Sequence, residues 1–255
     1  INTDPHEIQQ SMRETHPTSM SSVPRFWEKV YQAVKDKIDR SNPMQQKLFR
    51  HALEIGRKYN LECKSRCKRP SPMLAMEYKV FDKMVLRLVR KQLGLENANI
   101  FPTAGAAVSP EVERFAHSVG LNMVVGYGLT ESLATVSCDR ENMPYTIGSV
   151  GRPINGIDVK IGDNDEILLK GPTITVGYYR RDAANKEAFT EDGYFRTGDA
   201  GYIKNGELFL TDRIKDLFKT SNGKYIAPQM IESLLLVDKF IDQVVVIANE
   251  RKFVS

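Results

Sequence analysis

The chain has 255 residues, of which 41% are hydrophobic and 27% are charged. This composition excludes an intrinsically disordered chain and is sufficient for one or two hydrophobic cores. The net charge of +4 is too small to indicate a nucleic acid partner, and we expect none. No apolar run reaches the roughly 18 residues of a membrane-spanning helix. The three cysteines, Cys63, Cys67 and Cys138, lack a matching histidine pair, so they predict reduced thiols in a cytoplasmic protein.

The first hundred residues predict three amphipathic helices, over 24–39, 44–59 and 73–93, because apolar side chains recur there at helical spacing. In the first helix Trp27 lies on the apolar stripe, and its simplest role is that of a core anchor. The proline-containing stretch 68–72 separates the second helix from the third, since proline lacks the N–H that a helix needs.

Positive charge gathers in residues 47–69, which hold eight basic and two acidic side chains. Two interpretations stay open for this stretch. It is either an ordinary solvated surface, or a contact for anionic lipid headgroups or a phosphorylated ligand.

A β-α-β unit is predicted next, from a strand at 99–103, a helix that begins near Pro110 and ends at Gly120, and a strand at 121–125. Such a unit predicts a parallel sheet, in which ligands gather at the carboxyl ends of the strands. Two loops leave these ends, at 104–109 and 126–132.

Helical periodicity disappears after residue 148, and six short stretches read as strands. They predict a small antiparallel barrel or sandwich, with a hairpin turn at Asn205-Gly206. The six stretches are "GIDVKI", "DEILLK", "TITVGYY", "YFRTGD", "AGYIK" and "ELFLT". Beyond Arg213, a helix at 228–237 and a strand at 244–248 look like the opening of another α/β domain.

The loop "GYGLTES" at 126–132 combines residue types that suit a nucleotide and a metal ion. Gly126 and Gly128 allow a close approach of the backbone, while Tyr127 offers a flat face for a base. Thr130 offers a hydroxyl to a phosphate, and Glu131 offers a carboxylate oxygen to Mg²⁺. The alternative interpretation is an ordinary turn between a strand and a helix.

Two further segments carry candidate binding residues. In "GYFRTGDAGY", Asp199 could accept hydrogen bonds from ribose hydroxyls, although Asp is also common in tight turns. In "DRIKDLFKTSNGK", the cations Arg213, Lys215, Lys219 and Lys224 form either a solvated linker or a basic hinge over a polyphosphate.

These three segments, in this order and spacing, resemble the signature segments of the adenylate-forming superfamily. "VPRFWEKVY" (23–31) and the helical insert at 44–93 are similar to the long-chain fatty acyl-CoA synthetase branch. The resemblance implies a ligase that uses ATP and Mg²⁺ to join a fatty acid to AMP, and then forms a thioester with coenzyme A. It implies a cytoplasmic enzyme, with peripheral contact at the inner face of a membrane as a further expectation, and leaves the oligomeric state open.

The same resemblance implies a fold of α/β class with several subdomains. A parallel α/β subdomain with a helical insert, the C-terminal part of a larger domain, is expected at 1–148. A small antiparallel β-barrel is expected at 149–212, and the start of a small α+β C-terminal domain at 213–255.

Site roles follow by resemblance, position by position. The adenine pocket is expected to be formed by residues 104–107, which include Gly105, Ala106 and Ala107, and by Tyr127. Gly128 is expected to be a further nucleotide-binding residue. Thr130 is expected at the α-phosphate, Glu131 at Mg²⁺, and Asp199 with Arg213 at the ribose. Lys215 is expected to be the hinge, Lys219 to lie near the AMP phosphate, and Gly223 to face the pantetheine of coenzyme A.

The chain also departs from the superfamily pattern. Ala104 and Ala107 stand where a glycine and a proline are usual, no glycine-rich phosphate loop is found, and the C-terminal catalytic lysine is expected beyond Ser255. We therefore expect this chain to be a fragment that does not adenylate an acid by itself. A ligase for another carboxylic acid and a non-catalytic nucleotide or lipid-surface module remain alternatives. A dinucleotide dehydrogenase is disfavoured because the third glycine of its motif is missing.

Overall fold

The computed structural model describes residues 7–140, 143–219, 225–236, 238, 240–241 and 243–247. The chain forms two compact units. Unit 1 consists of Ile1–Thr103, Pro110–Val124 and Glu141–Ile147, and unit 2 consists of Ala104–Ser109, Val125–Arg140 and Gly148–Ser255. The elements confirm the predicted α/β class: helices dominate unit 1, and an antiparallel sheet dominates unit 2.

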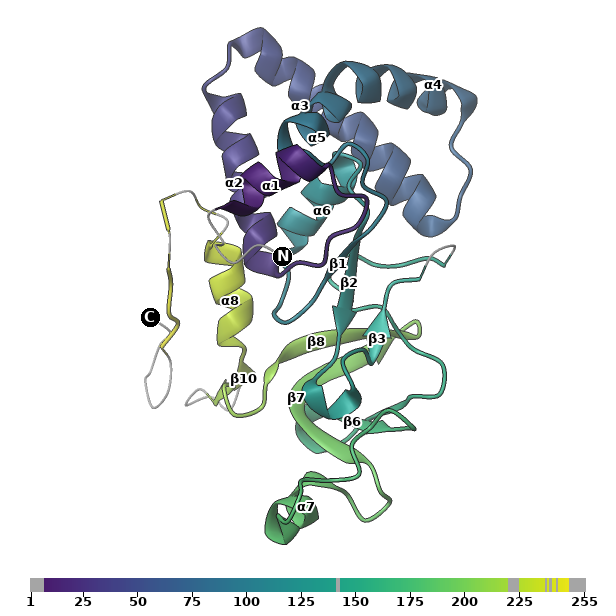
Figure 1. The fold of residues 1–255 in the computed structure, drawn as a ribbon, viewed down its shortest axis with the longest axis vertical. Coiled ribbons are helices and arrows are strands. Elements are labelled where there is room, and N and C mark those ends of the chain that lie inside the picture. The colour runs from purple at the N-terminus through teal and green to yellow at the C-terminus, as the bar shows by residue number, and fades with distance from the viewer. Residues whose placement is uncertain are drawn as a thin grey trace. The chain divides into compact units, whose positions relative to one another are not determined.

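Unit 1 contains the three helical segments that periodicity predicts. They are α2 (Pro24–Asp39), α3 (Pro43–Arg57), and α4 (Pro72–Phe81) with its continuation α5 (Arg87–Leu93) (Figure 1). A π-helical stretch, η4 (Asp82–Leu86), joins α4 to α5, and another, η2 (Lys58–Cys63), follows α3. Each of α2, α3 and α4 begins with proline, where the missing N–H costs no hydrogen bond. A shorter helix, α1 (Ile8–Thr15), precedes them.

Trp27 anchors the core of unit 1, as the sequence predicts. Its side chain is only 1% exposed, and Phe26 and Phe101 meet it edge to face. The indole Nε1 donates a hydrogen bond to Oγ1 of Thr103, at 2.9 Å. The one polar atom of this large side chain is therefore satisfied inside the core.

The predicted order of strand, helix and strand is confirmed by β1 (Phe101–Thr103), α6 (Pro110–Ser118) and β2 (Met123–Tyr127). In unit 1, the backbone N–H of Phe101 donates to the carbonyl of Asn122. In unit 2, the end of β2 pairs antiparallel with β3 (Ser137–Cys138), which pairs in turn with β4 (Arg152–Pro153).

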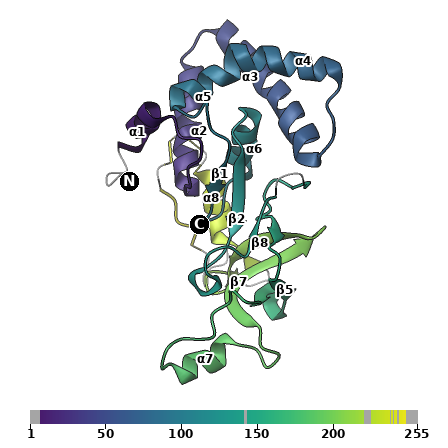
Figure 2. The same ribbon diagram turned by 45° about the vertical axis from the view of Figure 1, so that its right-hand side comes forward.

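The antiparallel region of unit 2 is a four-stranded sheet in sequence order, β5 (Asp158–Ile161), β6 (Glu166–Lys170), β7 (Phe195–Lys204) and β8 (Glu207–Arg213). Figures 1 and 2 show β7 and β8 as one long, curved hairpin. Its turn is Asn205-Gly206, and both residues have positive φ, 54° and 78°. This confirms the predicted hairpin turn.

Three of the predicted strands differ in the structure. "YFRTGD" and "AGYIK" are not two strands, because β7 runs through both. "TITVGYY" (173–179) forms no strand, since the N–H of Thr175 donates to the carbonyl of Glu131 instead of to a ladder partner. A short helix, α7 (Asp182–Ala188), follows this loop.

The C-terminal part begins with two short paired strands, β9 (Phe218–Lys219) and β10 (Tyr225–Ile226), and the helix α8 (Pro228–Leu235). This helix confirms the one predicted at 228–237. The strand predicted at 244–248 is not formed at 244–247, and residue 248 lies outside the described residues. Throughout the described ranges, every helix is too short or too polar to cross a membrane, and all three cysteines are free thiols.

Unit 2 also contains a carboxyl group with an unusual environment. Both carboxylate oxygens of Asp139, just beyond β3, are buried. Burial, together with the negative charge of Glu207, raises the pKa of Asp139 to about 7. A carboxyl group whose pKa rises on folding binds its proton more tightly in the folded state. Its stabilising contribution is therefore complete below the unfolded pKa of about 4 and is lost as the pH rises through about 7.

We predict that Asp139→Asn makes the protein more stable than the wild type above pH 7, by up to about 4 kcal/mol, because asparagine cannot ionise. The advantage should vanish well below pH 4, where Asp139 is protonated in both states. Urea unfolding across this pH range measures it. Asp192→Asn serves as the contrast, because Thr190 and Lys160 lower the pKa of Asp192 to about 2. Asp192→Asn should therefore be less stable than the wild type at neutral pH. A pH-independent difference for Asp139→Asn would contradict the account.

Candidate functional site

Three of the predicted site residues meet in unit 2, although they come from distant parts of the chain. Tyr127 ends β2, Asp199 lies in β7, and Arg213 ends β8. The hydroxyl of Tyr127 donates to Oδ2 of Asp199 at 2.7 Å. Nε of Arg213 lies 3.7 Å from Oδ1 of Asp199, and the two residues are direct partners in the β7–β8 ladder. We call this cluster the Tyr-Asp-Arg triad.

Burial and charge divide the roles within the triad. Tyr127 is 7% exposed, and burial together with the carboxylate of Asp199 raises the pKa of its hydroxyl. The phenol therefore stays protonated and keeps donating its hydrogen bond. The side chain of Arg213, by contrast, is 72% exposed, so its guanidinium is accessible from solvent.

The backbone around Asp199 is held by hydrogen bonds from its own strand and the next one. Oγ1 of Thr197 accepts from the N–H of Asp199 at 3.1 Å and donates to the carbonyl of Ile167 at 2.7 Å. Oε1 of Glu166 accepts from the N–H of Gly198 at 3.2 Å. Asp199 therefore projects from a fixed backbone, a requirement for a side chain that positions a ligand.

The loop after β2 is closed by its own residues. Oγ of Ser132 accepts from the N–H of Leu129 at 3.1 Å and donates to the carbonyl of Leu129 at 2.9 Å, and this serine is buried. At Gly128, a Cβ atom would lie 1.3 Å from the carbonyl oxygen of Ala134. Glycine is therefore required there for the close approach of the two backbone segments.

This closed loop presents Thr130 and Glu131 on a single 3₁₀ turn, η5 (Thr130–Ser132). Thr130 is exposed. Oε1 of Glu131 accepts a hydrogen bond from the hydroxyl of Tyr178 at 2.9 Å. The loop at 173–179 thus touches Glu131 twice, through the side chain of Tyr178 and the backbone of Thr175.

Sequence reasoning missed Ser132 and Tyr178. Ser132 belongs to the "GYGLTES" segment, but its inward direction depends on the 3₁₀ turn, which no periodicity signals. Tyr178 lay in a stretch interpreted as a strand. The signal that could have identified the loop is Gly177, which has a φ of +136° and disfavours a regular strand.

The other predicted site residues lie in the same unit. Gly105, Ala106 and Ala107 are exposed in the loop after β1, and the space beside Gly105, whose φ is +96°, is open. Lys215 is exposed in the turn after β8, where the N–H groups of Asp216 and Leu217 both donate to the carbonyl of Arg213.

Three predicted residues are described only in part or not at all. The backbone of Lys219 lies in β9, where the residue pairs with Tyr225. Gly223 and Lys224 lie outside the described residues.

The residues present fit a magnesium ion only in combination with a nucleotide. Within the ranges that the structure describes, no group of three His, Cys, Asp or Glu side chains could hold a metal. The loop after β2 offers the carboxylate of Glu131 and the hydroxyl of Thr130. Mg²⁺ usually binds through one or two carboxylates, with water and substrate phosphates completing its coordination.

Comparison with known proteins identifies the family. Residues 1–179 match the family described as "AMP-binding enzyme". The chain therefore belongs to the AMP-binding enzyme family, which confirms the predicted family resemblance.

Its curated relatives include two long-chain-fatty-acid–CoA ligases. FadD15 of Mycobacterium bovis is 34% identical, over 94% of this chain and 39% of the relative. Ligase 3 of Saccharomyces cerevisiae is 30% identical, over 98% of this chain and 35% of the relative. The chain thus spans between a third and two fifths of the length of these relatives.

A similar fold occurs in the adenylation domain of a carboxylic acid reductase from Segniliparus rugosus, solved with AMP and a co-purified carboxylic acid. The TM-score is 0.69 at 23% identity, over 99% of this chain and 36% of that one. At this identity the likeness establishes the fold alone.

We predict that Tyr127→Phe lowers the free energy of unfolding by about 1–2 kcal/mol, because Asp199 loses a buried donor. Urea unfolding measures the change. Tyr194→Phe is the matched control, since the Tyr194 hydroxyl also donates to a carboxylate, that of Asp158, at an exposed position of the same unit. A loss at Tyr127 no larger than that at Tyr194 would contradict a structural role for the triad.

Proposed function

We propose that this chain carries the adenylate-binding part of a long-chain fatty acid–CoA ligase. In this proposal the carboxylate of a fatty acid attacks the α-phosphate of ATP and displaces pyrophosphate. The thiol of coenzyme A then attacks the resulting acyl adenylate and displaces AMP. The names of the relatives and the family support the reaction class. The observation that carries the proposal is the Tyr-Asp-Arg triad, with Glu131 in the same unit.

The triad suits the ribose of an adenylate. Asp199 has one carboxylate oxygen occupied by Tyr127 and the other 3.7 Å from Arg213. A vicinal diol can donate to this carboxylate, and the exposed guanidinium can reach a ribose oxygen. In the proposal, the ring of Tyr127 and the loop holding Gly105, Ala106 and Ala107 border the adenine.

The loop after β2 suits the α-phosphate. The proposal assigns Thr130 to a phosphate oxygen and Glu131, oriented by the hydroxyl of Tyr178, to Mg²⁺. When bound, Mg²⁺ spreads the negative charge that builds up as a carboxylate attacks phosphorus. The attacking acid is already ionised at neutral pH, so this step needs no general base.

The second half-reaction is assigned to the C-terminal part. We propose domain boundaries at 148–149 and 212–213, with Lys215 as the hinge, Lys219 near the AMP phosphate and Gly223 facing the pantetheine. The exposure of Lys215 in a turn directly after β8 supports a hinge. Cytoplasmic location and a fatty acid as substrate are part of the same proposal.

The proposal predicts that the chain binds AMP and that Asp199→Asn weakens this binding about tenfold or more, the value of a lost charged hydrogen bond. Isothermal titration with AMP measures it. Asp158→Asn is the matched control, because Asp158 also accepts from a tyrosine but lies on β5. Equal AMP affinities of the wild type and Asp199→Asn would show that the triad takes no part in nucleotide binding.

The proposal also predicts that Glu131→Ala slows fatty-acid-dependent ATP–pyrophosphate exchange by about a hundredfold or more in the longer ligase that carries this chain, in line with the several kcal/mol of a metal's charge stabilisation. Glu187→Ala, at an exposed position of α7, is the control. An unchanged rate would remove Glu131 from the mechanism. Exchange that depends on an aryl or amino acid, and not on a fatty acid, would support a ligase with a different acid substrate.

A further inference from the structure

The carboxylate of Glu131 has a protein partner on one of its two oxygens. The hydroxyl of Tyr178 donates to Oε1 at 2.9 Å. Among the described residues, none donates a hydrogen bond to Oε2 or forms an ion pair with this carboxylate. Burial, together with the hydrogen bond to Glu131, raises the pKa of the Tyr178 hydroxyl, so the phenol stays protonated and keeps donating. One oxygen of the carboxylate is therefore occupied, and the other is not.

The backbone on both sides of this hydrogen bond is held in place. The N–H of Tyr178 donates to Oδ1 of Asn185, in α7, at 2.6 Å, and Nδ2 of Asn185 donates to the carbonyl of Tyr178 at 3.0 Å. The residue before it, Gly177, has a φ of +136°, which favours glycine. On the other side, the N–H of Thr175 donates to the carbonyl of Glu131 at 2.7 Å. The phenol and the carboxylate therefore meet from fixed backbones.

A carboxylate held in this way presents one oxygen to a cation. Mg²⁺ requires near-ideal octahedral geometry, whereas Ca²⁺ takes about six to eight oxygens in flexible geometry and accepts both oxygens of one carboxylate. The two oxygens of a carboxylate lie closer together than two neighbouring corners of a regular octahedron require. Occupation of Oε1 by Tyr178 therefore favours coordination through Oε2 of Glu131 alone, the mode that suits Mg²⁺.

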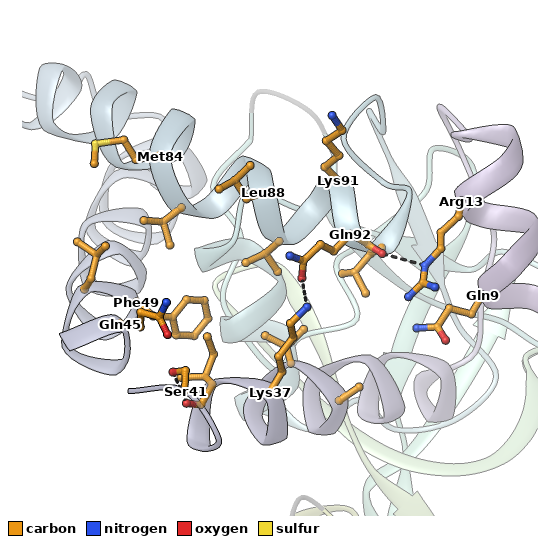
Figure 3. A pocket seen from close by; sticks show the side chains of 17 residues that line it. Gln9, Arg13, Lys37, Ser41, Gln45, Phe49, Met84, Leu88, Lys91 and Gln92 are labelled. Atoms are coloured by element: carbon orange, nitrogen blue, oxygen red, sulfur yellow. Dashed lines mark hydrogen bonds between the residues drawn. The ribbon is translucent and has the colours of Figure 1, made fainter. Parts of the chain in front are cut away.

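The groove in unit 1 does not compete for a divalent cation. This groove, of about 870 Å³, has no Asp or Glu in its lining. Nζ of Lys37 donates to Oε1 of Gln92 at 2.8 Å, and Nε of Arg13 donates to the carbonyl of the same residue at 3.1 Å (Figure 3). Lys91 adds a third positive charge to the lining. Because these side chains repel a cation, the groove does not set a preference between metals.

We propose that Tyr178 is a positioning residue for Glu131, and that its hydroxyl makes the site select Mg²⁺ over Ca²⁺ by limiting Glu131 to one coordinating oxygen. The inference rests on the proposed function, in which Glu131 binds the metal of the ATP complex. It deepens that function because it assigns the choice of metal to a residue outside the "GYGLTES" segment. Loss of the hydroxyl releases Oε1, so Glu131 can offer both oxygens and suits Ca²⁺ better.

A purely structural role of the same hydrogen bond makes a different prediction. Tyr178 is 38% exposed, and the net contribution of one such hydrogen bond to stability is small. If the bond only tied the loop at 173–179 to η5, its loss would weaken the complexes of both metals alike. The ratio of the two affinities therefore separates positioning from structure.

The test is isothermal titration of the longer ligase that carries this chain with α,β-methylene-ATP, in the presence of either Mg²⁺ or Ca²⁺. This analogue cannot be cleaved between the α- and β-phosphates, so binding is measured without turnover. Tyr178→Phe should weaken binding with Mg²⁺ about three- to tenfold, the value of roughly one hydrogen bond, and should not weaken binding with Ca²⁺. The preference for Mg²⁺ should therefore fall by at least the same factor.

Two control variants accompany the test. Tyr179→Phe changes the neighbouring tyrosine, which is 83% exposed and has the guanidinium of Arg180 5.0 Å from its ring centre, and it should change neither affinity. In a Glu131→Ala background, Tyr178→Phe should have no further effect, because Tyr178 acts through Glu131. Urea unfolding shows whether each variant is folded. Asn185→Ala, which keeps the phenol but releases its backbone, should shift the preference in the same direction and serves if Tyr178→Phe does not fold.

Three results would overturn the proposal: an unchanged metal preference in Tyr178→Phe, an equal shift in Tyr179→Phe, or an effect of Tyr178→Phe that persists without Glu131. Failure of the inference can be told apart from failure of the proposed function. If Glu131→Ala slows ATP–pyrophosphate exchange while Tyr178→Phe keeps the metal preference, only the positioning role is wrong. If Glu131→Ala leaves the exchange rate unchanged, Glu131 does not bind the metal and both are wrong.

Discussion

The hydrogen bond from Tyr127 to Asp199 is the interaction on which the candidate site depends. It joins the end of β2 to the middle of β7, and the two residues are 72 positions apart in the chain. Tyr127 is buried, and the bond holds the Asp199 carboxylate against the end of β2. The ladder partner of Asp199 then brings in Arg213. A phenol, a carboxylate and a guanidinium thus meet without belonging to one sequence motif.

Two devices in the loop after β2 make this arrangement rigid. Gly128 lets the backbone approach Ala134 more closely than any side chain allows, and Ser132 closes the turn onto Leu129. The loop therefore presents Thr130 and Glu131 from a fixed backbone, and Tyr178 holds the Glu131 carboxylate from the side. The loop of such a site loses little conformational entropy when a ligand binds, because it is already ordered.

Much of the fold was predictable because it depends on local signals. Helical periodicity located α2, α3 and α4, and Asn205-Gly206 located the β7–β8 hairpin. The segments that hold Tyr127, Asp199 and Arg213 could be recognised from the sequence. The hydrogen bond from Tyr127 to Asp199 could not be predicted, because no local sequence pattern indicates a contact between residues 72 positions apart. The loop at 173–179 was misread because its apolar alternation imitates a strand, while its backbone bonds elsewhere.

The central claim is that one unit of this chain, unit 2, forms the adenylate site. Photolabelling with 8-azido-AMP, followed by peptide mapping, tests it most directly, because the azide reacts with whatever borders the adenine. The account predicts label in the peptides that hold residues 104–107 or Tyr127, and loss of that label when unmodified AMP competes. Label confined to the helices of unit 1, or label that AMP does not displace, would contradict it.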